Sequence, residues 1–201
     1  MATRSGFAAV PIGSWSDYRM VRGAKTFSVR VALVSRTADE AVVETAIELV
    51  PPKPNAKTVI DYHLAVHPDD PGSARSVVVQ MGSKAPFVAP GMRADFRPFE
   101  RVDQGSLVAT EPVSVPAGRF ATARHYRKQA ATGQTWDVWL DKAVFPLGIV
   151  SFTRNGLADK SHGKAMLPAR WDLVRSGTSG ARSQIDRPLA PVPKSFAHWK
   201  Q

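Results

Sequence analysis

Residues 27–49 read FSVRVALVSRTADEAVVETAIEL, and the spacing of apolar residues in this stretch decides the fold. Apolar or β-branched residues alternate with polar or small ones over 27–33 and again over 43–49. Successive side chains of a strand point to opposite faces, so a period of two predicts two strands, each with one buried face. Residues 37–40 between them are typical of a turn, so the stretch is expected to form antiparallel strands.

The same alternation recurs farther along the chain, over residues 62–66, 77–81, 120–126 and 136–140. Turn-forming residues separate these runs, and the chain contains 16 prolines, each of which would interrupt a helical ladder. The pattern predicts a mainly β fold, either a meander, a barrel or a wrapped sheet. One or two short helices are expected, with candidates at residues 93–102 and 159–167.

The composition sets limits on the class of protein. The chain has 201 residues with 43% hydrophobic side chains, which is enough to bury a core. It contains no cysteine, which excludes disulfides, thiolate metal sites and a cysteine nucleophile. Residues 1–175 are expected to form the curved-sheet domain. Residues 176–201 form a Pro-rich C-terminal tail, predicted to dock through Phe196 and Trp199.

The net charge of +10 is compatible with an acidic partner, but the basic residues are scattered along the sequence. We therefore favour a generally basic surface over nucleic-acid binding. No apolar stretch reaches the roughly 18 residues of a transmembrane helix, so no membrane-spanning segment is expected. The expected location is the periplasm if a leader has been removed, and the cytoplasm otherwise.

The search for catalytic and metal-binding patterns predicts neither activity. His63 and His67 lie four positions apart on a predicted strand, which separates them by about 13 Å and is too far to share one ion. There is no Gly-x-Ser-x-Gly elbow and no phosphate-binding glycine loop before a helix. Asp137 and Asp141 are expected on a solvated strand face. The sequence thus predicts a protein that is not an enzyme and has no metal or cofactor.

Aromatic residues are concentrated on the predicted strands, where they either fill the core or line a cavity for an apolar ligand. Trp136 and Trp139 have opposite parity, so one is expected to point inward and the other outward.

Several motifs resemble those of bacterial envelope proteins. Residues 115–126 (VPAGRFATARHY) resemble a hairpin of lipoprotein-localisation carriers (LolA/LolB-like) and of DUF3108-type proteins. The likeness extends, in matching order, over roughly residues 11–177, through four further motifs: GSWSDY (13–18), TWDVWLDK (135–142), VFPLGIVSF (144–152) and WDLVRSG (171–177).

The resemblance implies an incomplete β-barrel, in which one strongly curved antiparallel sheet surrounds an apolar cavity. We therefore predict non-catalytic binding of a lipid, an acyl chain or a lipidated protein on the concave side. An alternative is a structural or interaction subunit that uses its basic surface and aromatic-ended tail to bind a protein partner. The predicted cavity-lining residues are Phe27, Val29, Val31, Val43, Ile47, Leu64, Val79, Phe120, Trp136 and Val138.

Overall fold

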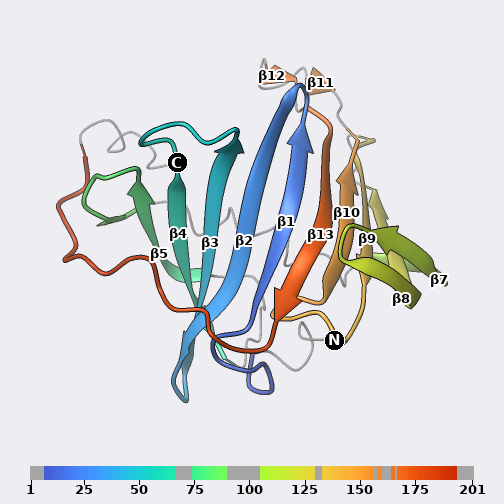
Figure 1. The fold of residues 1–201 in the computed structure, drawn as a ribbon, viewed down its shortest axis with the longest axis horizontal. Coiled ribbons are helices and arrows are strands. Elements are labelled where there is room, and N and C mark those ends of the chain that lie inside the picture. The colour runs from blue at the N-terminus through green and yellow to red at the C-terminus, as the bar shows by residue number, and fades with distance from the viewer. Residues whose placement is uncertain are drawn as a thin grey trace.

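The dominant feature of the computed structural model is a sheet of 11 strands (Figure 1). The structure describes residues 7–66, 74–89, 105–129, 133–155, 158–159, 164–165 and 167–193. The sheet order is β6-β5-β4-β3-β2-β1-β13-β10-β9-β8-β7, and neighbouring strands are antiparallel. The strands of this sheet are β1 (Trp15–Arg22), β2 (Lys25–Arg36), β3 (Glu40–Val50), β4 (Thr58–Ala65), β5 (Ala74–Met81), β6 (Phe87–Val88), β7 (Ser106–Val115), β8 (Gly118–Gln129), β9 (Thr135–Leu140), β10 (Ile149–Arg154) and β13 (Ala169–Gly177).

The sheet is strongly curved and remains open. Its two edges are β6 and β7, which do not pair with each other. In Figure 1, the β7–β8 hairpin at the right runs across the direction of β2 at the centre. The predicted mainly β, curved and incompletely closed sheet is therefore confirmed.

One of the two helix predictions is wrong. Residues 158–159 and 164–165, inside or beside the predicted helix 159–167, instead pair as the short antiparallel strands β11 (Ala158–Asp159) and β12 (Lys164–Ala165). Gly163 lowers the helix propensity of this segment, so strand pairing is the better local alternative. The other candidate, residues 93–102, lies outside the described residues.

The register of β2 and β3 confirms the parity read from residues 27–49. Phe27 lies opposite Leu49, and Val31 lies opposite Thr45, so the alternating apolar positions share one face. Val29 and Val31 are completely buried, whereas Ser28, which precedes Val29, is exposed. The face that carries Val29 and Val31 is called the apolar face below, and the opposite side is the polar face.

Loop residues complete the core on the apolar face. Phe7, Val10, Val144 and Leu147 belong to the same buried cluster as the strand residues. Full burial of a side chain of this kind stabilises the fold by about 1.5–3 kcal/mol, so the apolar face contributes most of the hydrophobic stabilisation.

The chain after β13 crosses the polar face. Residues 178–193 contain no helix or strand, and backbone hydrogen bonds join Ala181 to Gly13 and Ala190 to Pro86. In Figure 1, this orange-to-red segment runs from the end of β13 toward β5. The predicted anchors Phe196 and Trp199 lie outside the described residues.

Gly82 shows why one turn requires glycine. Its φ of 57° is in the left-handed region, and an added Cβ would lie 2.5 Å from the carbonyl oxygen of Asn55. The amide of Gly82 donates to the carbonyl of Lys57 at 2.7 Å, which holds the end of β5 against the start of β4. Only glycine combines this backbone angle with so close a backbone approach.

Candidate functional site

The ten predicted cavity-lining residues all lie on the apolar face. The strand registers place them on the same side of β2, β3, β4, β5, β8 and β9. Every one belongs to the buried core cluster or packs against it. The sequence therefore grouped these residues correctly, although a role in ligand binding stays a prediction.

Burial divides this set into two parts. Six of the ten are at most 4% exposed: Val29, Val31, Val43, Leu64, Val79 and Val138. The other four, Phe27, Ile47, Phe120 and Trp136, are only partly buried. Because the first group contacts the chain's own core, a ligand on this face would first meet the partly buried residues.

A continuous apolar row crosses the sheet at the level of Phe27. Neighbouring members lie directly opposite one another in the strand registers, and Trp171 makes an edge-on contact with Phe152 at a centroid distance of 6.1 Å. We call this row the aromatic strip, and from β3 to β8 it consists of Leu49, Phe27, Met20, Trp171, Phe152, Val138 and Tyr126. The predicted set contains only Phe27 and Val138 of this row. The other five members were missed, because only the register aligns them with Phe27.

On the polar face, β1, β2 and β13 are joined by an ion-pair network around Asp17. Arg30 donates to both oxygens of the Asp17 carboxylate, at 2.7 and 3.0 Å, and Arg175 donates to Oδ2 at 2.8 Å. Both guanidinium groups also lie over the ring of Trp15, at 4.7 and 5.4 Å from its centroid. Burial raises the pKa of Asp17, but the two arginines outweigh it and hold this pKa below its ordinary value.

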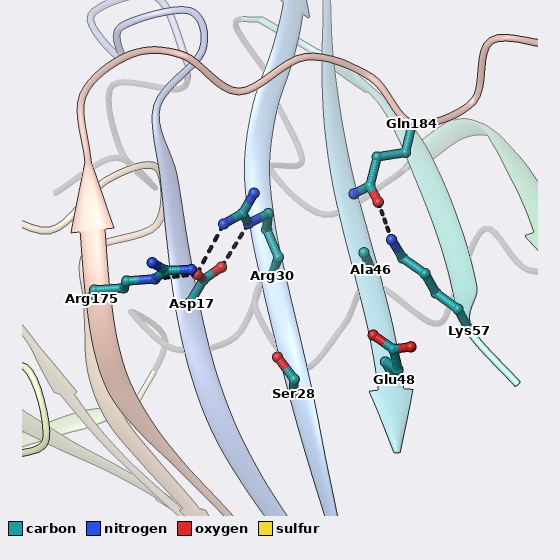
Figure 2. Close-up of a pocket in the computed structure, with 8 residues that line it drawn as sticks. All are labelled: Asp17, Ser28, Arg30, Ala46, Glu48, Lys57, Arg175 and Gln184. Carbon is teal, nitrogen blue, oxygen red and sulfur yellow. Dashed lines mark hydrogen bonds and ion pairs between the residues drawn. The ribbon is translucent and has the colours of Figure 1, made fainter. Parts of the chain in front are cut away.

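A small polar pocket of about 170 Å³ adjoins this network (Figure 2). Figure 2 shows Asp17 between Arg30 and Arg175 on one side, with Gln184 and Lys57 hydrogen-bonded to each other on the other. The pocket contains charges of both signs, and its cations already have partners within the chain. Its geometry is better explained as an attachment site for residues 178–193, called the C-terminal segment below, than as a ligand site.

The attachment is made through Glu44, which is 1% exposed. Its carboxylate accepts hydrogen bonds from the backbone N and side-chain Nε2 of Gln184, at 2.6 and 2.7 Å, and from Ser183 Oγ at 3.3 Å. These bonds satisfy a buried charge that would otherwise be costly. The C-terminal segment is thus a structural part of the polar face.

Asp61 lies directly opposite Glu44 on the neighbouring strand and is 7% exposed. Burial raises the pKa of Asp61 to about 7, with a further contribution from the negative charge of Glu44 and a smaller opposing one from His63. Its Oδ1 has no hydrogen-bond partner among the described residues. The carboxyl group is therefore held largely as a neutral acid below neutral pH.

A second polar cluster lies at the other end of the sheet, around His125. Nε2 of His125 is 2.6 Å from Asp137 Oδ1, and Nδ1 is 3.1 Å from Glu111 Oε1. The imidazole also stacks on Trp139, with centroids 4.3 Å apart and 18° between the planes. The prediction that Asp137 is solvated is wrong, since it is 7% exposed, because β8 supplies His125 and Arg127 as its partners.

Trp136 and Trp139 do point to opposite faces, as their parity predicts, since Trp139 lies opposite His125 and Trp136 lies opposite Lys128. His63 contacts Glu40 at 3.0 Å, while His67 is outside the described residues. Within the described ranges, no group of three potential ligands is arranged to hold a metal ion. No helix there is long and apolar enough to cross a membrane.

No family model matches this chain, and no curated protein does either. Several solved structures are similar to it, among them the following three. A hypothetical protein of Chlamydia trachomatis has 10% identity and a TM-score of 0.47, with 90% of this chain and 94% of that chain covered. MucB has 10% identity and a TM-score of 0.42, with 91% and 58% covered. A putative lipoprotein from Parabacteroides distasonis has 12% identity and a TM-score of 0.41, with 86% and 99% covered.

Proposed function

We propose that this protein binds an apolar ligand on the apolar face of its sheet, with no chemical step. The ligand would be a lipid, an acyl chain or the lipid portion of a lipoprotein. The aromatic strip is the observation that carries this proposal. It forms a continuous row of large apolar side chains, several of them only partly buried, across many strands of an open sheet.

The strip supplies contact area at low entropic cost. Phe27 and Trp171 are partly buried beside the completely buried Val29 and Leu173, so their positions are already restricted by packing. An apolar ligand that covered their remaining exposed surface would gain about 25 cal/mol for each Å² removed from water. Rigid aromatic side chains lose little conformational freedom when they bind.

The dimensions of the strip suit a chain-like ligand. It crosses seven strands from β3 to β8. At about 4.8 Å between strands, this row is on the order of 30 Å long, which can accommodate an extended acyl chain. The likeness of residues 115–126 to lipoprotein-localisation carriers supports the same ligand class and a place in the bacterial envelope.

Quenching by a brominated fatty acid tests the proposal. Bromine quenches tryptophans that it contacts, and Trp171 lies on the apolar face whereas Trp15 lies on the polar face. Titration with dibromopalmitic acid should quench the parent protein. Trp171→Phe should lower the quenchable signal, and part of it should remain because Trp136 also lies on the apolar face. Trp15→Phe is the control and should retain it. Equal loss in both variants, or no saturable quenching of the parent, would refute binding at the strip.

The second candidate is a structural or interaction subunit. Leu107 and Val108 at the edge of the sheet are 56% and 50% exposed, and Leu189 in the C-terminal segment is 55% exposed. Exposed apolar residues of this kind are typical of contact surfaces. Light scattering of the parent and of a Leu107→Ser/Val108→Ser variant tests this role. A monomeric parent that also shows no change of mass with concentration would count against self-assembly.

A further inference from the structure

The β7–β8 hairpin curls back over the polar face at its own end of the sheet. Although β7 is the last strand in the sheet order, it contacts β10 and β13. The amide of Ala117, in the hairpin turn, donates to the carbonyl of Leu173 on β13 at 3.0 Å. Register shifts between Leu107 and Ala109 and between Glu111 and Val113 bend β7, as bulges do.

The curl borders an open cleft of about 330 Å³. One wall is β7, with Glu111, Pro112 and Val113, and the floor is formed by Trp139 and residues of β10 and β13. The cleft is therefore lined by polar groups as well as apolar ones. This cleft is on the polar face and is therefore separate from the apolar cavity that the sequence predicts on the opposite face.

The Glu111 carboxylate is oriented within this cleft. Trp139 Nε1 donates to its Oε1 at 2.8 Å, and Nδ1 of His125 lies 3.1 Å from the same oxygen. His125 is itself held by Asp137 at 2.6 Å and by stacking on Trp139. Because both contacts reach Oε1, Oε2 has no partner among the described residues and can accept a hydrogen bond from a ligand. The carboxylate side chain is 41% exposed, so a ligand can reach it.

A cation and two hydroxyl groups line the same cleft. Arg170 is paired with Asp172 through its Nε at 2.7 Å, and its side chain is 61% exposed. In the described part of the chain this pairing leaves its terminal amino groups available for an anion. Thr153 adds a hydroxyl group, whereas the hydroxyl of Ser151, which is 3% exposed, already bonds to Asp172 at 2.9 Å. Trp139, Pro112 and Val113 add apolar surface.

We propose that this cleft binds a small zwitterion of the amino-acid type. The ligand's amine would contact Glu111 Oε2, its carboxylate would contact Arg170, and its side chain would pack on Trp139 and Val113. A lone anion would meet the Glu111 carboxylate, and a lone cation would meet Arg170, so a ligand that carries both charges fits best. A free amino acid and a short peptide share this chemistry, and the test separates them.

Addition of a partner strand to the edge of β7 explains the cleft less well. Pro112 has no N–H to donate, and the two register shifts interrupt a regular edge. Proline and bulges at an edge are features that prevent strand pairing. A compact ligand inside the curl is therefore favoured over an extended one along it.

Calorimetric titration of the full chain with L-phenylalanine tests the proposal. N-acetyl-L-phenylalanine lacks the cationic amine, and L-phenylalaninamide lacks the anionic carboxylate. We expect each blocked analogue to bind about tenfold more weakly than L-phenylalanine, as loss of one charge-assisted hydrogen bond implies. L-alanyl-L-phenylalanine then distinguishes a dipeptide site from an amino-acid site.

Two variants assign the ends of the ligand. Glu111→Gln should abolish the preference for L-phenylalanine over its N-acetyl analogue and keep the preference over the amide. Arg170→Gln should abolish the preference for L-phenylalanine over its amide and keep the preference over the N-acetyl analogue. Arg119→Gln changes an exposed arginine on the same hairpin outside the cleft and should alter neither preference. Thermal melting by circular dichroism verifies that each variant is folded.

Three results would overturn the proposal. The first is no saturable heat with either L-phenylalanine or the dipeptide at millimolar concentration. The second is equal affinity for L-phenylalanine and both blocked analogues. The third is a loss of both preferences together in either variant, which would point to a general disturbance of the cleft rather than to recognition of one end.

Discussion

The two faces of strands β1–β4 can be compared position by position, because neighbouring residues on one strand point to opposite sides. On the apolar face, Val29 and Val31 are 0% exposed and are held by packing. On the polar face, Arg30 between them is paired with Asp17. Packing is insensitive to pH, whereas the polar face contains carboxyl groups whose pKa values are shifted in opposite directions. The comparison shows that the same strands are stabilised on one face by packing, which does not depend on pH, and on the other by charged groups, whose contribution does.

The largest effect is expected on the apolar face. Leu33 is 0% exposed, so Leu33→Ala leaves a cavity and should lower the free energy of unfolding by about 3 kcal/mol. Leu107 is 56% exposed, and Leu107→Ala should cost less than about 0.5 kcal/mol. Urea unfolding at pH 5 and pH 8 measures both. A cost for Leu33→Ala that changed strongly with pH would break the distinction between the faces.

The next effect is a gain in stability on the polar face. The folded-state pKa of Asp61 is raised from 3.8 to about 7, so the folded state binds this proton more tightly than the unfolded state. The free energy of unfolding therefore falls as the pH rises between these two values, and the loss is complete above the higher one. Asp61→Asn cannot ionise and should gain about 2 kcal/mol over the parent between pH 4 and pH 8.

Asp39→Asn is the matched control for that prediction, since Asp39 is exposed. Its stability relative to the parent should stay nearly constant over the same pH range. Urea unfolding at several pH values gives both comparisons. A constant difference for Asp61→Asn would mean that Asp61 is ionised in the folded protein throughout the range.

A smaller loss is expected at the ion-pair network. Asp17→Asn leaves Arg30 and Arg175 without their shared carboxylate, but these side chains are 38% and 66% exposed, so water compensates much of the loss. We expect a cost of about 1 kcal/mol at neutral pH, reduced by added salt. Because the folded-state pKa is lowered, this contribution disappears as the pH falls through that pKa. Thermal unfolding in low and high salt measures it.

The smallest effect concerns the C-terminal segment. Gln184→Ala removes the Nε2 hydrogen bond to Glu44 and the hydrogen bond that Lys57 donates to Oε1. It keeps the backbone bond to Glu44, so a cost of only about 1 kcal/mol is expected. Amide hydrogen exchange should increase at Ala181 and Ala190, whose N–H groups join this segment to the rest of the chain. Unchanged exchange at both amides would show that Gln184 does not hold the segment in place.

Much of the sheet could be predicted because its signal is local. The alternation over residues 27–33 and 43–49 reappears in the register of β2 and β3, with Phe27 opposite Leu49. Residues 115–126, which resemble a hairpin in sequence, contain the turn of the β7–β8 hairpin, in which β8 begins at Gly118. The predicted helix at residues 159–167 is wrong, because a short segment of mixed pattern does not distinguish a helix from a tight strand pair.

The polar sites could not be predicted in the same way. Glu111 and Trp139 are 28 residues apart, and nothing local indicates that their side chains meet. Asp137 was expected in solvent because its neighbours alternate regularly, but the pairing of β8 with β9 brings His125 and Arg127 to it. The curl of β7 depends on shifts in its register with β8, and the spacing of apolar residues does not predict such shifts.

The sequence by itself determined that the chain forms strands and which residues of each strand share a face. Side-chain direction in a strand alternates with every residue, so this information is present in any short stretch. Only the tertiary structure decided which polar residues are buried and which carboxyl group pairs with arginine. It also decided where the β7–β8 hairpin folds over the sheet to form a cleft. Those outcomes depend on the register and curvature of strands that are distant in sequence, and the local spacing of apolar residues does not specify them.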